Sequence, residues 1–240
     1  MIGDFLSMAN NGNGLPTWKK FAAFEVFGDY SPTPGFRVLV RIGAKPDRLR
    51  ELLEKRAPSS DVLDPDLARA HLRAGLGLLR TGLVRFAYAT TEEVIVILNP
   101  DATQNGASVE VQSRLVSDYS SALSLLLGQP ICANACIYEL PDIAVARRGL
   151  VALAEDVEEA TPLRSAMWLG AQLQGRGQPF HPSMVETLEE QSHLLQSNGI
   201  DMDALPAWWW RGMAAVSNGS GVDVYDELPS GDELGRLVSE

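Results

Sequence analysis

Two adjacent carboxylates, Glu92 and Glu93, are the side chains of this sequence with the clearest chemical potential. They follow two threonines in a short polar stretch between the apolar runs 86–89 and 94–98, so the pattern predicts a β-hairpin with both carboxylates at its tip. Mg2+ is usually held in proteins by one or two carboxylates together with water and substrate phosphates. The hairpin is therefore either a divalent cation site or an ordinary acidic turn.

The elements that must position this hairpin are predicted from hydrophobic periodicity and turn residues. We predict strands at 36–42, 84–88, 94–98 and 131–138 and helices at 64–82 and 109–126. The order strand, helix, strand, strand, helix, strand is that of a ferredoxin-like βαββαβ unit, an α+β fold with an antiparallel sheet and, here, additional C-terminal helices. In this topology the end of the first strand lies beside the hairpin, so Gly43 and Glu92 are expected to be close.

The two helices of this unit have clear boundaries and apolar stripes. Asp64 is the expected N-cap of the first helix and Gly82 its end. The second helix has its inner face at Val111, Leu115, Tyr119, Leu123 and Leu126. His71 lies beside the stripe of the first helix, and we interpret it as a packed or half-exposed side chain rather than a catalyst.

The C-terminal half is predicted to be helical but less regular. We expect helices at 142–157, ended by Pro162, at 163–173, and at 182–195 with Ser183 and Glu186 near the start. Three consecutive tryptophans, 208–210, cannot share one face, so at least one should be exposed or at an interface. Their packing onto the sheet and their use as a ligand or partner surface both remain open.

The expected organisation of the chain has four parts. Residues 1–17 form a flexible lead-in, 18–140 the βαββαβ domain, 141–216 a helical part packed on it, and 217–240 an acidic tail with little core.

Composition narrows the classes of partner. The 240 residues carry a net charge of −11 with a pI of about 4.8, which disfavours binding of tRNA or other RNA, although a local basic patch from Arg37 to Arg50 could still bind it.

No apolar run reaches the ~18 residues of a membrane span, and the start has no signal-peptide pattern, so we expect no membrane partner and a cytoplasmic location. Cys132 and Cys136 are expected to be unpaired core residues, and three scattered histidines indicate no zinc site.

Three segments carry a resemblance to a known family. VRIGAK at 40–45 is similar to VRIDGR, FAYATTEEVIVIL at 86–98 to FAYGxSDEYSFVF, and NGIDMDALPAWWWRG at 198–212 to a closing GI(D/N)xxxLPxxxxRG segment. All three motifs, in this order, are those of the tRNA(His) guanylyltransferases, which add nucleotides to the 5′ end of RNA. The chain resembles this family from about residue 36 to 212.

The resemblance implies a polymerase-like palm domain that uses Mg2+ and a nucleoside triphosphate. In the family, two cations are held by an Asp at the end of the first strand, an Asp in the hairpin and a backbone carbonyl. Carried over, Glu92 becomes the catalytic residue, and Glu92, Glu93 and Gly43 the metal site. The expected nucleotide contacts are Arg41, Gly43, Ala44, Lys45 and Thr91. The resemblance also implies a homo-oligomer.

The carry-over is incomplete. Gly43 stands where the family has its first Asp, Glu92 replaces the hairpin Asp, and Lys45 replaces an Arg. Residues 133–136 replace an FDxR segment, and 155–164 contain no counterpart of the family's HxxNN motif. Losing a carboxylate ligand removes several kcal/mol of transition-state stabilisation, which corresponds to orders of magnitude in rate.

Three hypotheses follow. In the first, the chain binds a nucleotide or a protein partner but has lost standard two-metal nucleotide addition. In the second, it is an active nucleotidyltransferase with altered metal coordination and a substrate other than tRNA. In the third, it is a non-catalytic scaffold that contacts protein partners through the tryptophans and the acidic tail.

Overall fold

The computed structural model of the chain describes residues 25–26, 33, 35–44, 51–52, 55, 65–103, 108–219 and 221–238. The predictions for residues 1–17, for Lys45 and for the cap at Asp64 lie outside these residues. The strands are Glu25–Val26 (β1), Arg37–Ala44 (β2), Val84–Ala89 (β3), Glu93–Leu98 (β4), Ala133–Leu140 (β5), Met213–Ser217 (β6) and Val222–Tyr225 (β7). The α-helices are Pro65–Gly77 (α3), Ser108–Leu127 (α4), Ile143–Gly175 (α5), Leu188–Ser197 (α6), Ala207–Arg211 (α7) and Asp232–Arg236 (α8).

One antiparallel sheet organises the described part of the chain. Its strand order is β1-β5-β2-β4-β3-β6-β7, and the central order β5-β2-β4-β3 is that of a ferredoxin-like unit. The predicted βαββαβ palm fold is therefore confirmed. Two strands that the sequence analysis did not predict, β6 and β7, extend the sheet beyond β3.

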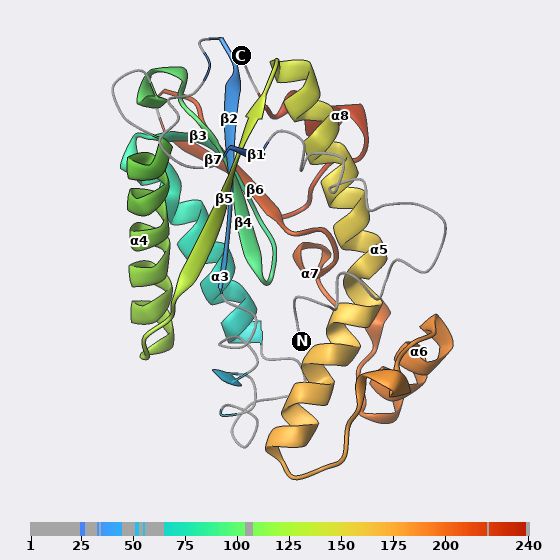
Figure 1. The fold of residues 1–240 in the computed structure, drawn as a ribbon. Helices are drawn as coiled ribbons and strands as arrows, with labels where there is room; N and C mark the ends of the chain where they lie inside the picture. The colour runs from blue at the N-terminus through green and yellow to red at the C-terminus, as the bar shows by residue number, and fades with distance from the viewer. Residues whose placement is uncertain are drawn as a thin grey trace.

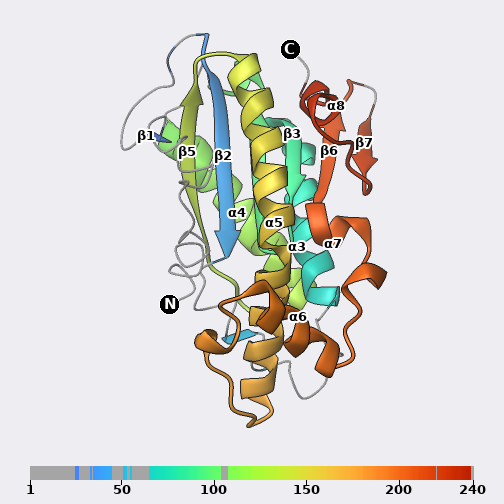
Figure 2. The same cartoon turned by 90° about the vertical axis from the view of Figure 1, so that its right-hand side faces the viewer.

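The sheet is covered on both faces, as Figure 1 shows, by α3 and α4 on one side and by α5 on the other. The alternation along β2 explains this arrangement, because Val38, Val40 and Ile42 are buried in the core with α3 and α4, whereas Leu39 belongs to the core beneath α5. Figure 2 shows α5 running lengthwise over the sheet, with β6 and β7 at one edge.

The helix α5 differs from the prediction that Pro162 ends it. It runs unbroken from Ile143 to Gly175 with Pro162 inside. A proline in a helix removes one backbone hydrogen bond. Burial of Val157, Thr161 and Ser165 on both sides of the proline holds the helix together.

The start of α6 also differs from the prediction. Residues 182–184 form a separate 3-10 turn, and Ser183 contacts His181 rather than Glu186. The α-helix begins only after Thr187, whose hydroxyl and backbone N–H form a capping box with Glu190. The predicted stop is confirmed at Asn198 and Gly199, where Gly199 has a φ of 78°.

The segment after residue 217 does not match the expectation of an acidic tail with little core. It contains β7 and α8, and it buries Leu228, Leu234 and Val238 beneath α5. Backbone carbonyls of this segment accept hydrogen bonds from Arg147 and Arg211. Its few apolar residues are sufficient to fold the segment, because they pack against an apolar surface that the rest of the chain provides.

Two smaller predictions are wrong, and a third is tested only in part. Leu126, three residues after Leu123, is 45% exposed, and Leu127, four residues after Leu123, packs on the core instead. Cys132 precedes β5 and is exposed rather than in the core, and neither cysteine forms a disulfide, as predicted. The prediction that at least one of the three consecutive tryptophans is exposed or at an interface is tested only for exposure: Trp209 is buried and its two neighbours are half-buried.

Candidate functional site

The β3–β4 hairpin is closed by Thr90. The Thr90 backbone N–H donates to the Glu93 carbonyl at 2.8 Å, and the Thr90 hydroxyl accepts from the backbone N–H groups of Glu92 and Glu93 at 3.3 and 3.2 Å. A threonine that bonds its own turn in this way fixes the backbone of the tip. The two carboxylates are thus presented from a defined turn.

Gly43 lies directly opposite this turn, as expected. It pairs with Glu93 in the β2–β4 register, and a Cβ built on Gly43 would lie 3.5 Å from the Glu93 Cβ and 3.6 Å from the Glu92 carbonyl oxygen. These are ordinary contact distances, so the absence of a side chain here is not required by packing. The end of β2 and the hairpin tip form one corner of the sheet.

Glu93 forms an ion pair with Arg41. The Arg41 Nε donates to the Glu93 Oε2 at 2.6 Å, and the two side chains are 25% and 19% exposed. The Glu93 carboxylate raises the pKa of Arg41 above its ordinary value, while partial burial acts in the opposite direction. One hairpin carboxylate is therefore neutralised by the strand beside it.

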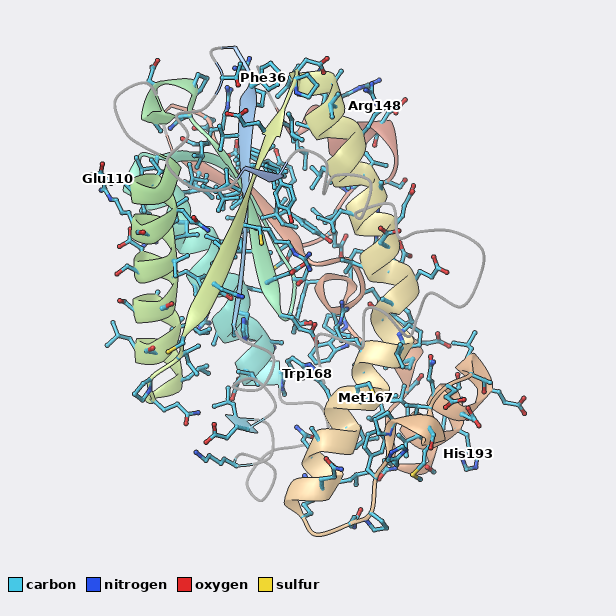
Figure 3. The ribbon with its side chains drawn as sticks, in the orientation of Figure 1. Phe36, Glu110, Arg148, Met167, Trp168 and His193 are labelled. Carbon is cyan, nitrogen blue, oxygen red and sulfur yellow. The ribbon has the colours of Figure 1, made fainter. Side chains whose placement is uncertain are left out.

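Glu92 is held by α5. The indole N–H of Trp168 donates to the Glu92 Oε1 at 2.9 Å, and Trp168 lies on the sheet-facing side of α5 (Figure 3). Burial raises the pKa of the half-buried Glu92, and Glu93 adds to this rise, whereas Arg164 and the Trp168 hydrogen bond oppose it.

Arg164 supplies the second positive charge at this corner. Its Nη2 donates to the Thr161 hydroxyl at 2.6 Å and to the Trp209 carbonyl at 3.0 Å. Burial lowers the pKa of Arg164 and Glu92 is the largest influence that raises it, but an arginine remains charged at neutral pH. Its Nε is buried without a hydrogen-bond partner among the described residues.

We call Arg41, Glu92, Glu93, Arg164 and Trp168 the hairpin charge cluster. Its two carboxylates and two guanidinium groups sum to zero net charge. The described residues contain no group of three or more His, Cys, Asp or Glu side chains that could hold a metal ion. Beside Gly43, the hairpin offers two carboxylates, and that of Glu93 is already paired with Arg41. Any Mg2+ ion here would therefore take most of its oxygen ligands from water and phosphate.

The expected nucleotide contacts have unequal positions. Arg41, Gly43 and Ala44 line the end of β2 beside the hairpin, whereas Thr91 is only 1% exposed and its hydroxyl has no hydrogen-bond partner in the described part of the chain. Lys45 follows this strand end directly in the sequence.

Sequence reasoning missed Arg164 and Trp168. The available signal was their spacing, because residues four apart on a helix share a face, and here they share it with Thr161 and Ser165. The sequence analysis ended a helix at Pro162. It therefore did not assign Thr161, Ser165, Arg164 and Trp168 to one continuous helical face.

The Arg-Gly pair of the C-terminal motif has a structural role in this chain. The Tyr88 hydroxyl of β3 donates to the Arg211 carbonyl at 2.7 Å, and the Arg211 guanidinium binds the Leu228 and Pro229 carbonyls. Gly212 has a φ of 77°, and a Cβ there would lie 2.5 Å from the Ala89 carbonyl oxygen. Only glycine fits this turn, which leads the chain into β6.

Comparison with solved structures supports the fold. A bacterial tRNA(His) guanylyltransferase-like protein in complex with ATP matches with a TM-score of 0.64 at 13% identity, over 100% of this chain and 99% of that one. A bacterial tRNA(His) guanylyltransferase-like protein in complex with GTP matches with a TM-score of 0.55 at 14% identity, over 88% and 89% of the two chains. The tRNA(His) guanylyltransferase of Saccharomyces cerevisiae matches with a TM-score of 0.59 at 14% identity, over 83% and 92%.

Comparison at the level of sequence adds no relative, because neither a protein-family model nor a curated protein matches the chain. Among the described residues, no helix is both long and apolar enough to cross a membrane.

Proposed function

We propose that the chain is a diverged relative of the tRNA(His) guanylyltransferases that binds a nucleoside triphosphate at the end of β2 but has lost standard two-metal addition of nucleotides to RNA 5′ ends. The nucleotide part is supported by the fold shared with two bacterial proteins whose structures are complexes with ATP and with GTP. The proposed contacts are Arg41, Gly43, Ala44 and Lys45, but not Thr91, which is buried at the hairpin tip.

The observation that carries the loss of activity is the position of Gly43. The strand register places residue 43 against the hairpin, where a carboxylate would face Glu92 and Glu93, and this residue offers only its backbone carbonyl. Without that carboxylate, two cations cannot both be given near-octahedral oxygen shells by the hairpin.

Nucleotide binding is tested by calorimetry and thermal unfolding with ATP and GTP. We expect a concentration-dependent rise in Tm for the wild type, because a ligand at 100 times its Kd stabilises the folded state by about 2.7 kcal/mol. The variant Lys45→Ala should lose most of this rise, whereas the matched control Lys55→Ala, an exposed lysine paired with Glu51, should keep it. No rise at millimolar nucleotide would refute the nucleotide part.

Loss of catalysis is tested with labelled nucleoside triphosphate, 5′-triphosphorylated tRNA(His), and Mg2+ or Mn2+. We expect no incorporation by the wild type. The variant Gly43→Asp fits the available space and should gain divalent cation affinity, while Gly221→Asp, at an exposed position with open space around its Cβ, should not. Unchanged cation affinity of Gly43→Asp would contradict the alignment of β2.

The alternative is an active nucleotidyltransferase with altered metal coordination on a substrate other than tRNA. The retention of a carboxylate at position 92 favours it. Incorporation into another RNA, abolished by Glu92→Ala, would establish this alternative and remove the first proposal.

The scaffold hypothesis keeps part of its support. Trp209 packs against α5, with the Trp168 and Trp209 ring centroids 5.4 Å apart, whereas its two neighbours are half-buried. The C-terminal segment is folded onto the same helix, but its strand β7 exposes Val222 and Val224.

A further inference from the structure

We infer that Trp168, through its hydrogen bond, and Arg164, through its positive charge one helical turn earlier on α5, stabilise the Glu92 carboxylate in place of a divalent cation, so that the hairpin needs no metal. The inference concerns the chain with neither nucleotide nor metal bound, and it does not require nucleotide binding. It would also make any nucleotide bound here independent of a cation at Glu92, and that consequence alone rests on the proposed function.

The charges at the tip require compensation. Two neighbouring carboxylates in one partly buried turn repel each other, and each needs an opposite charge or a donor. Arg41 forms an ion pair with Glu93 at 2.6 Å. Glu92 is therefore the carboxylate that a cation would otherwise have to neutralise. Glu92 instead accepts the Trp168 N–H at 2.9 Å, and Arg164 lies one turn before Trp168 on the same face of α5.

The two groups from α5 are fixed in place by their own neighbours. Arg164 is bound to the Thr161 hydroxyl and to the Trp209 carbonyl. The Trp209 indole donates to the Ser165 hydroxyl at 3.0 Å and packs edge-on against Trp168. Preorganised donors of this kind need no reorganisation to stabilise an anion.

The continuity of α5 through Pro162 is what delivers these groups. Arg164 and Trp168 lie two and six residues beyond the proline, on the face that includes the buried Thr161 and Ser165. A helix that ended at residue 161 would place neither group at the hairpin. The proline therefore lies in the same part of α5 as Arg164, whose positive charge replaces that of a cation.

The test measures Mn2+ binding by electron paramagnetic resonance and calorimetry, and Tm with and without Mn2+, all in the absence of nucleotide. The wild type should show no saturable Mn2+ binding at the hairpin below millimolar concentration. Arg164→Met should have a lower Tm, should bind Mn2+ at least tenfold more tightly than the wild type, and should regain Tm when Mn2+ is added.

The matched control is Arg148→Met, which removes an exposed arginine near the opposite end of α5 (Figure 3). It should behave as the wild type. The double variant Arg164→Met/Glu92→Gln should lose the gained Mn2+ binding, and binding that survives Glu92→Gln lies elsewhere in the chain.

If Arg164→Met does not fold, Trp168→Phe decides the question. It removes the N–H that binds Glu92 but keeps an aromatic ring against Trp209, and we expect a threefold to tenfold gain in Mn2+ affinity that Glu92→Gln abolishes. The inference is overturned if the wild type already binds Mn2+ at micromolar concentration through Glu92, or if the folded variants bind no more Mn2+ than the wild type. Failure of ATP and GTP to bind would refute the proposed function while leaving these Mn2+ results decisive.

Discussion

The hairpin charge cluster and the His71–Tyr119 pair are two polar sites that this fold handles in opposite ways. The cluster lies between the hairpin and α5, where Glu93 pairs with Arg41 and Glu92 accepts a hydrogen bond from Trp168. His71 lies between α3 and α4, 1% exposed, where its Nδ1 is 2.8 Å from the Tyr119 hydroxyl and its Nε2 has no hydrogen-bond partner among the described residues.

The difference shows how partners determine ionisation. In the cluster, the opposite charge of Glu93 raises the pKa of Arg41 and keeps it charged. At His71 no opposite charge among the described residues offsets burial, and burial lowers the pKa to about 4, so the imidazole stays neutral at pH 7. The two sites should therefore respond differently to acid and to the loss of one partner.

The largest expected effect is an acid-dependent loss of stability from His71. Because the pKa of His71 is lower in the folded chain than its usual 6.5, the unfolded chain binds the extra proton between pH 6.5 and about 4, and stability falls as the pH decreases through this window. Lowering the pKa from 6.5 to about 4 corresponds to on the order of 3 kcal/mol. Urea unfolding from pH 7.5 to 4 measures the slope.

The variant His71→Gln should remove this contribution, and the exposed control His193→Gln should keep the wild-type slope. Identical slopes for wild type and His71→Gln would show that folding does not lower the pKa of His71.

The second effect is loss of the Arg41–Glu93 pair. Arg41→Met leaves the Glu93 carboxylate partly buried without its partner, and we expect a fall of about 2 kcal/mol in the free energy of unfolding at pH 7.5, between the values for exposed and buried pairs. Adding Glu93→Gln should recover part of this loss. Arg37→Met, on the same strand, is the control and should change stability by less than about 0.5 kcal/mol; equal losses for both arginines would contradict the role of the pair.

The smallest effect is the loss of one neutral hydrogen bond. Tyr119→Phe removes the hydroxyl that bonds His71 and should cost about 1 kcal/mol. Because burial and not this hydrogen bond lowers the pKa of His71, the acid slope should persist in the variant. Tyr225→Phe, at the edge strand, provides the control, and disappearance of the slope in Tyr119→Phe would assign the pKa to the hydroxyl instead.

Much of the fold was accessible from local patterns. The alternation of Val38, Val40 and Ile42, the left-handed Gly82 that ends the first helical segment, and the polar turn before Glu93 were sufficient for the order of elements and hence for the palm topology. The closeness of Gly43 to the hairpin followed from that topology alone. These features depend on residues adjacent in the chain or on the period of a strand or helix.

The partners of Glu92 could not be predicted in the same way. Arg164 and Trp168 are separated from it by more than 70 residues, and only the packing of α5 across the sheet brings them together. Likewise, Pro162 is a helix breaker by local rules, yet the helix continues, because the buried contacts on both sides of it outweigh one missing hydrogen bond. Local sequence signals determined the position of the two carboxylates in the hairpin. Only the long-range packing of α5 determined which groups lie near them, because electrostatic interaction depends on distance in space and not on separation along the chain.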